Sequence, residues 1–201
     1  MDEGVAGLII IACVLWQGVT GQYHPLHVER LKRQVEPYAP EHRFVCLSNT
    51  QPWQQGDGIE YIPLQDGNKG WWSKLELFRP GLFDGRVLYL DLDVEVVGDL
   101  TPIIEYPSRF ASIKDYMNPK QINSSVMVFD PGAGAAAYTS DPPITDYHGD
   151  QGFISDAIPD IERFPKEWCP SYRMQVKRFG RPDKAKIVVY HGSPKPWSLA
   201  A

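Results

Sequence analysis

The sequence lacks the long apolar run that would place it among membrane proteins. A membrane-spanning helix needs about 20 apolar residues, whereas the most apolar stretch, Val5–Trp16, has 12. The residues before it, Met1-Asp2-Glu3, are acidic, unlike the basic start of a signal peptide. We therefore interpret Val5–Trp16 as a buried first strand, and we expect a cytoplasmic protein with no integral membrane segment.

Three further shortages exclude other classes of protein. The chain contains no glycine-rich phosphate loop of the P-loop kind. It carries a net charge of −5 and no evident basic stripe, so we expect no nucleic-acid partner. The three cysteines, Cys13, Cys46 and Cys169, are odd in number and lack paired spacing. This pattern predicts free thiols in a reducing compartment.

Strand-like and helix-like segments alternate through the first half of the chain. The expected strands there are Leu8–Leu15, Arg43–Leu47, Ile59–Ile62 and Val87–Leu90, and the expected helices are Pro25–Val35 and Trp71–Phe78. Such alternation is typical of an α/β fold with a mainly parallel sheet.

The second half contains more expected strands than helices. The strands are Val94–Val97, Phe110–Ile113, Ser125–Phe129 and Ile187–Tyr190, with one helix at Gln151–Ala157. A mixed sheet is therefore expected. Residues 131–147, rich in Gly, Ala and Pro, have the weakest signal for regular structure and are predicted to form a mobile flap. No domain boundary stands out, so we expect a single domain over residues 1–201.

Two carboxylates stand at the end of the most regular apolar strand. Asp91-Leu92-Asp93 directly follows Arg86–Leu90. In an extended chain, residues i and i+2 point to the same side, so Asp91 and Asp93 face one spot. Two adjacent carboxylates need a neutralising cation, and oxygen ligands suit Mn²⁺ or Mg²⁺ with phosphate oxygens. The pair predicts half of a metal–diphosphate site beyond the carboxyl ends of the strands.

A second cluster of functional residue types follows the last expected strand. His191-Gly192-Ser193-Pro194-Lys195-Pro196-Trp197 offers an imidazole as a third metal ligand and an ammonium for a phosphate. The two prolines stiffen this loop. The alternative is a proline-rich tail closed by a packed tryptophan.

Four segments in this order resemble one family. Asp91-Leu92-Asp93, Asn123–Phe129, Asp150-Gln151 and His191–Trp197 are similar to motifs of the retaining glycosyltransferases of the glycogenin and lipopolysaccharide galactosyltransferase type. The resemblance covers roughly residues 8–197. The His-Gly-X-X-Lys-Pro-Trp ending is its most specific part, whereas an Asp-X-Asp alone is weak. The resemblance implies a single Rossmann-like GT-A domain, a nucleotide-sugar donor, with UDP as the expected nucleotide, and Mn²⁺.

The resemblance also implies a role for each matching residue. The implied metal ligands are Asp91, Asp93 and His191. The implied donor contacts are Lys195 at the diphosphate, Lys74 at the phosphate or sugar, Asp115 near the sugar, and Asn123 and Ser124 in a turn beneath it. Gln151, beside Asp150, matches the residue on the β face of the anomeric carbon.

Three departures from the family pattern affect substrate choice. Asn123-Ser124-Ser125 replaces the usual Asn-X-Gly and adds a side chain near the sugar. Trp16 stands in an apolar segment where the family is polar, so the uracil contacts do not transfer. Residues 131–147 replace an expected helix, which leaves the acceptor region open.

Several of these residues also have a purely structural interpretation. The structural alternative for Lys74 is a solvated helix charge, for Asp115 a turn cap and for Asp150 a helix N-cap. Trp16 either stacks on the base of the donor or packs as an ordinary aromatic.

Taken together, the residues predict metal-dependent, retaining transfer of a hexose from a nucleotide sugar. Retention occurs by double displacement or by front-face attack, and the amide Gln151 is a poor nucleophile, which favours front-face attack. The alternatives are a metal-dependent nucleotidyltransferase or phosphohydrolase, and a non-catalytic nucleotide-sugar-binding module. The acceptor stays unidentified. The sequence shows no basic or amphipathic C-terminal tail of the kind that reaches lipid-linked acceptors, so a soluble glycan, a protein or a small molecule fits as well as a cell-envelope acceptor.

Overall fold

A computed structural model describes residues 8–18, 22–50 and 58–199 of the chain. The acidic start and the first residues of the apolar run Val5–Trp16 lie outside this part. None of the described helices has the length and apolar character needed to cross a membrane.

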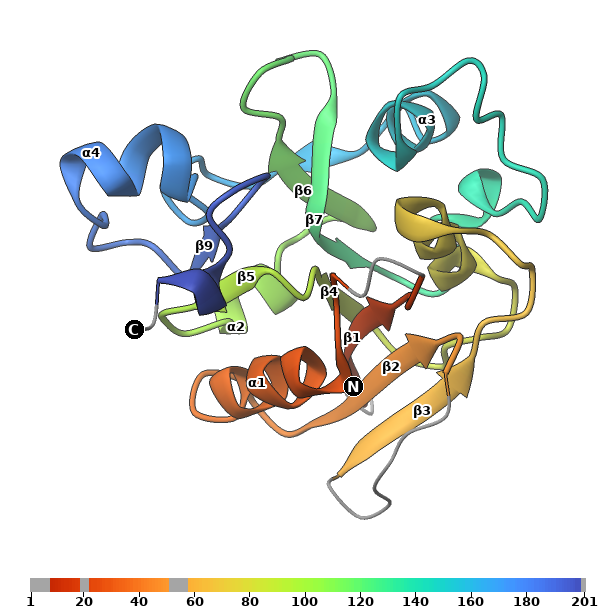
Figure 1. The fold of residues 1–201 in the computed structure, drawn as a ribbon, viewed down its shortest axis with the longest axis horizontal. Helices are drawn as coiled ribbons and strands as arrows, with labels where there is room; N and C mark the ends of the chain where they lie inside the picture. The colour runs from red at the N-terminus through yellow and green to blue at the C-terminus, as the bar shows by residue number, and fades with distance from the viewer. Residues whose placement is uncertain (1–7, 19–21, 51–57, 200–201) are drawn as a thin grey trace, which may run out of the picture.

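The centre of the fold is a seven-stranded mixed sheet with strand order β3-β2-β1-β4-β7-β6-β8 (Figure 1). Its strands are β1 (Ile9–Leu15), β2 (His42–Ser48), β3 (Ile59–Pro63), β4 (Val87–Leu90), β6 (Phe110–Lys114), β7 (Ile122–Phe129) and β8 (Glu162–Arg163). Strands β3, β2, β1 and β4 pair in parallel, β7 runs antiparallel to β4 and β6, and β8 pairs in parallel with β6. A separate antiparallel pair joins β5 (Val94–Val96) to β9 (Ile187–Val189). The expected α/β class with a mixed, mainly parallel sheet is therefore confirmed.

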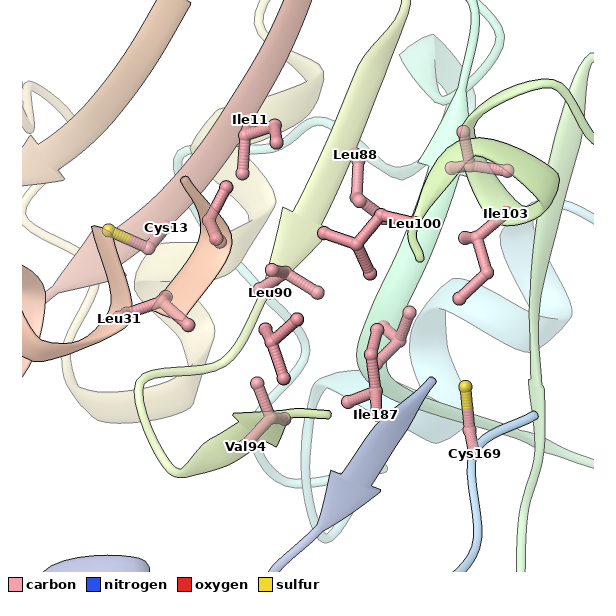
Figure 2. Packing of buried hydrophobic residues seen from close by; sticks show 14 of the residues in the cluster. Ile11, Cys13, Leu31, Leu88, Leu90, Val94, Leu100, Ile103, Cys169 and Ile187 are labelled. Carbon is pink, nitrogen blue, oxygen red and sulfur yellow. The ribbon is translucent and has the colours of Figure 1, made fainter. Parts of the chain in front are cut away.

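Successive side chains along the buried strands point to opposite faces of the sheet, so the core consists of two layers, one on each face. Ile11 and Cys13 of β1 face α1 (Pro25–Val35), where Leu31 packs against them, and Figure 2 shows these side chains near Leu90 of β4. The other face of the sheet packs against the 3₁₀ helix Gly70–Phe78 and α3 (Asp150–Ala157). Each fully buried Leu or Ile contributes about 1.5–3 kcal/mol to folding.

Two elements that bear on the site differ from expectation. The segment expected as a helix over Trp71–Phe78 is a 3₁₀ helix that begins at Gly70. Strand β7 begins at Ile122, so Asn123 and Ser124 lie in a strand and not in a turn. Their buried polar groups are satisfied locally, since Ser112 Oγ donates to the Asn123 carbonyl oxygen at 3.0 Å beside an irregularity in the β6–β7 register.

Several short elements have too few residues for a periodic pattern. They are α2 (Thr101–Ile104), the 3₁₀ helices Ala135–Ala137 and Pro196–Ser198, the π-helical turn Tyr172–Val176 and α4 (Lys177–Phe179). The three cysteines are buried and free, as predicted. Cys13 and Cys46 are paired in register across β1 and β2.

Candidate active site

A cavity of about 800 Å³ opens where the order of the strands reverses. The chain runs from β1 outward to β2 and β3, then returns to place β4 on the other side of β1. Open α/β sheets bind their ligands at this kind of crevice, beyond the carboxyl ends of the strands. Trp16 follows β1 and Asp91 follows β4, and both line the cavity.

A buried lysine connects two carboxylates at the base of the cavity. Lys74 Nζ lies 3.1 Å from Asp91 Oδ1 and 3.1 Å from Asp150 Oδ2, and it donates to Ser124 Oγ at 2.9 Å. Burial alone would lower the pKa of the Lys74 ammonium, but Asp150 and Asp91 outweigh burial and raise the pKa above its ordinary value. Lys74 is therefore a fixed positive charge inside the site and not a solvated helix charge.

Asp150 and Gln151 enter the site from the first turn of α3. Gly149 is the N-cap of this helix, so Asp150 is its first residue and not its cap. Ser124 Oγ donates to Asp150 Oδ2 at 2.6 Å, and the Ser124 backbone N–H donates to Gln151 Oε1 at 3.2 Å. Ser124 thereby ties the start of α3 to β7. The side chains of Asp150 and Gln151 both line the cavity. Their hydrogen bonds with Ser124 hold Asp150 Oδ2 and Gln151 Oε1 in place.

Asp91 is stabilised as a carboxylate. Tyr89 donates its hydroxyl proton to Asp91 Oδ1, and the Asp91 backbone N–H donates to the Ser125 carbonyl at 2.9 Å. Burial would raise the pKa of Asp91, but Lys74, Tyr89 and Ser125 outweigh it and lower the pKa below its ordinary value. Asp91 is therefore ionised at neutral pH.

Asp93, in contrast to Asp91, has a pKa above its ordinary value. Burial and the nearby charge of Asp91 raise its pKa, against the opposing effect of Lys195 and Tyr23. Lys195 Nζ donates to Asp93 Oδ2, and Tyr23 donates its hydroxyl to the same oxygen at 2.9 Å. The two carboxylates thus repel each other in the described structure, and a further cation would relieve this repulsion.

Arg30 of α1 holds the turn that carries the carboxylates. Its guanidinium donates to the carbonyl oxygens of Leu92 at 2.7 Å and Val94 at 2.9 Å. The same guanidinium lies over the Trp197 ring, 5.5 Å from its centroid, and His27 stacks on that ring at 3.8 Å. Helix α1 therefore anchors both the Asp91–Asp93 turn and the loop that carries Lys195.

His191 is not assembled with the two aspartates. Its Nε2 lies 2.6 Å from Ser171 Oγ, and its ring stacks on Tyr116 with centroids 5.2 Å apart. Burial and then Arg173 lower its pKa, which keeps the imidazole neutral. Within residues 8–18, 22–50 and 58–199, no group of three His, Cys, Asp or Glu side chains is arranged to hold a metal ion. The two carboxylates fit a divalent cation, whereas the three-ligand set with His191 stays a prediction.

The remaining predicted residues occupy different positions. Asp115 lies between β6 and β7, where its Oδ1 accepts from the N–H groups of Met117 at 2.8 Å and Asn118 at 2.6 Å. It therefore caps a turn and is not among the residues that line the cavity. Asn123 is buried in β7, and its Oδ1 accepts from the Ser125 N–H at 3.1 Å. Donor contacts by both residues stay predictions, as does base stacking by Trp16.

Three contributors to the site carry no signal in the sequence that would reveal them, whereas Trp71 stands beside Gly70 and polar residues, a setting in which a tryptophan lines a groove as readily as it fills a core. Tyr23 and Arg30 contact the Asp91–Asp93 turn from distant segments, and Tyr89 supports it from within β4. Trp71 lines the cavity with 59% of its surface exposed, an unusual position for a tryptophan.

No protein-family model matches the sequence, and no curated protein matches it significantly. Solved structures do match the fold. The glycosyltransferase GlyE of Streptococcus pneumoniae TIGR4 aligns with a TM-score of 0.67 and 15% identity, over 94% of this chain and 56% of that chain. The galactosyltransferase LgtC, in complex with donor and acceptor sugar analogues, aligns with a TM-score of 0.69 and 14% identity, over 94% and 89%. Mouse xyloside xylosyltransferase 1 aligns with a TM-score of 0.54 and 13% identity, over 94% and 99%. This chain thus spans little more than half of GlyE, and at these identities the likeness establishes a shared GT-A fold.

Proposed function

We propose that this protein is a metal-dependent retaining glycosyltransferase that moves a hexose from a nucleotide sugar, with UDP as the nucleotide, to an acceptor. The observation that carries the proposal is the meeting of Asp91, Asp93 and Lys195 at the strand-order reversal, beside the Lys74–Asp150 ion pair. The fold shared with glycosyltransferases supports it, and one of these, LgtC, was crystallised with donor and acceptor sugar analogues.

The charges in the cavity fit a nucleoside diphosphate with a divalent cation. Asp91 and Asp93 present oxygen ligands on one turn, and their mutual repulsion favours binding of Mn²⁺ or Mg²⁺. Lys195 pairs with Asp93 and lines the same cavity, which makes it our candidate to bind a phosphate oxygen. A bound divalent cation would neutralise part of the negative charge on the diphosphate. The nucleoside diphosphate would then be a better leaving group.

Lys195 stabilises the departing diphosphate in this proposal. As the bond between the anomeric carbon and the phosphate oxygen breaks, negative charge builds on the β-phosphate, and the ammonium offsets it. The contact of Trp197 with Arg30 and His27 holds this loop, so only the Lys195 side chain has to move from Asp93 to the phosphate. The same phosphate oxygen then accepts the proton of the attacking acceptor hydroxyl.

The contacts of Asp150 and Gln151 support front-face attack over a covalent intermediate. Asp150 Oδ2 already accepts from Ser124 and pairs with Lys74, which makes it a weak nucleophile. Gln151 is an amide whose Oε1 accepts from the Ser124 N–H, and its dipole can stabilise positive charge at the anomeric carbon. An active-site glutamine-to-glutamate mutant of LgtC has been crystallised, and Gln151 is our candidate for the comparable role here.

The test is a donor panel. The full chain is incubated with Mn²⁺ and a series of nucleotide sugars, and free nucleoside diphosphate and monophosphate are measured separately. We expect Mn²⁺-dependent release of diphosphate from at least one donor, reduced at least 100-fold by Asp93→Asn but not by the exposed control Asp160→Asn. Absence of diphosphate release from every donor would refute the transferase function. Release of monophosphate would instead indicate a phosphohydrolase.

A further inference from the structure

A short basic segment, residues 172–186, lies on the surface beside the candidate active site. It contains six basic residues and one acidic residue in a chain whose net charge is −5. The basic residues are Arg173, Lys177, Arg178, Arg181, Lys184 and Lys186. They escape notice along the sequence because, apart from the adjacent Lys177 and Arg178, polar and apolar residues separate them.

The first half of this segment is a fixed helical element. Ser171 caps it, since Ser171 Oγ accepts from the Met174 N–H at 3.1 Å. Tyr172 stacks on Tyr190 with centroids 4.5 Å apart and planes inclined by 14°. The helical turns end at Gly180, whose φ of +81° suits glycine. Figure 1 shows α4 at the left edge of the molecule, on the side of β9.

Five of the six cations of this segment are exposed. Arg173, Lys177, Arg178, Arg181 and Lys184 are all exposed. Among the residues that the structure describes, none of these five forms an ion pair with a carboxylate. Their charge therefore acts outward, in contrast to Lys74 and Lys195 in the cavity.

Two apolar side chains project from the same helical turns. Phe179 is 72% exposed and Met174 is 44% exposed. Phe179 lines neither the main cavity nor the small cavity beside Phe78, and the Arg178 guanidinium lies 5.1 Å from its ring centroid. An exposed phenylalanine among unpaired cations is the combination that interfacial membrane-binding helices use.

We propose that residues 172–186 bind the surface of an anionic phospholipid bilayer, with Phe179 and Met174 entering the headgroup region. The cations attract anionic headgroups, and the apolar side chains gain burial that a soluble polyanion would not offer. Ser171 also contacts His191 at 2.6 Å, and the next residue along the chain, Gly192, lines the cavity, so a docked segment brings this side of the cavity toward the bilayer. This proposal is independent of the transferase activity.

Vesicle co-sedimentation of the full chain tests the proposal. The probes are vesicles of phosphatidylcholine alone and vesicles of phosphatidylcholine with phosphatidylglycerol. We expect sedimentation with the anionic vesicles only, weakened by added salt. Neutralising a cation of the segment should lower partitioning about fivefold, so the pair Lys177→Gln and Arg178→Gln should lower it about 25-fold. Phe179→Ser should also lower partitioning.

Matched surface variants serve as controls. Arg109 and Ile144 are exposed and lie outside the segment, so Arg109→Gln and Ile144→Ser should leave partitioning unchanged. The proposal fails if neither vesicle sediments the protein, if both vesicles do so equally, or if the control variants act like the segment variants. It also fails if a single-stranded RNA oligonucleotide binds through the same cations while the anionic vesicles do not.

Discussion

Lys74 Nζ lies 3.1 Å from Asp91 Oδ1, and through the same ammonium it joins the end of β4 to the start of α3. This contact places a fixed positive charge next to Asp91, which we propose as a metal ligand. The Lys74 ammonium and the Asp91 carboxylate each stabilise the charged form of the other. Removal of either group would leave the other as an uncompensated buried charge.

The first prediction concerns this ion pair. Lys74→Met should destabilise the fold by about 3–5 kcal/mol, because Asp91 and Asp150 lose their buried partner. Urea unfolding of both proteins measures the difference. Lys69→Met, on an exposed lysine just before the same 3₁₀ helix, is the control and should change stability by less than about 0.5 kcal/mol. Equal stability of Lys74→Met and the wild type would contradict the account.

The second prediction concerns Arg30. Arg30→Met removes two hydrogen bonds to the Asp91–Asp93 turn and the contact with Trp197. Because a displacement of about 1 Å can cost a factor of about 100 in rate, kcat/KM should fall about 100-fold. Arg33→Met on the exposed face of α1 should leave it unchanged. A purely structural role would appear as lost stability with unchanged kcat/KM in the folded fraction.

The third prediction concerns pH and His27. Burial, and then Arg30 and His24, lower the pKa of His27 below its ordinary value of 6.5. As the pH falls, the unfolded chain therefore takes up a proton before the folded chain does. The contribution of His27 to stability is complete above pH 6.5 and is lost as the pH falls below it.

His27→Phe keeps an aromatic ring against Trp197 and removes this titration. Urea unfolding between pH 8 and pH 5 (values chosen to span the ordinary histidine pKa of about 6.5) should show a smaller acid-induced loss for the variant than for the wild type. A variant whose stability falls with acid as steeply as the wild type would show that His27 does not titrate in this way.

The fourth prediction concerns Trp16, which lines the cavity after β1. If the indole stacks on the donor base, Trp16→Ala should raise the donor KM about 10-fold, since stacking contributes about 1–3 kcal/mol per base. Trp16→Phe should restore most of the affinity. A loss of stability with an unchanged donor KM would instead make Trp16 a packing residue.

The sequence alone predicts the limits of those elements whose residues follow a regular pattern of burial. The limits of α1 and β4 agree with expectation because Val28 and Leu31 face the core at helical spacing and Val87–Leu90 is wholly buried. The position of Asp91 at the strand-order reversal follows from the same strand.

The contacts within the site depend on residues far apart in the chain. Nothing local to Lys74 indicates that Ser124 and Asp150 surround it, and nothing near Tyr23 indicates Asp93. The start of β7 at Ile122 was not predicted because the next two residues, Asn123 and Ser124, are polar. Their polar groups form hydrogen bonds inside the fold, which removes the usual reason to place such residues in a turn.

We infer that Asp91 and Asp93 hold a cation that binds a nucleoside diphosphate, and calorimetric titration of UDP measures this binding. UDP is titrated into the wild type and into Asp93→Asn, with and without Mn²⁺. We expect Mn²⁺ to tighten UDP binding at least 10-fold in the wild type and to have little effect in Asp93→Asn. UDP affinity that is the same with and without Mn²⁺ in the wild type would contradict the account.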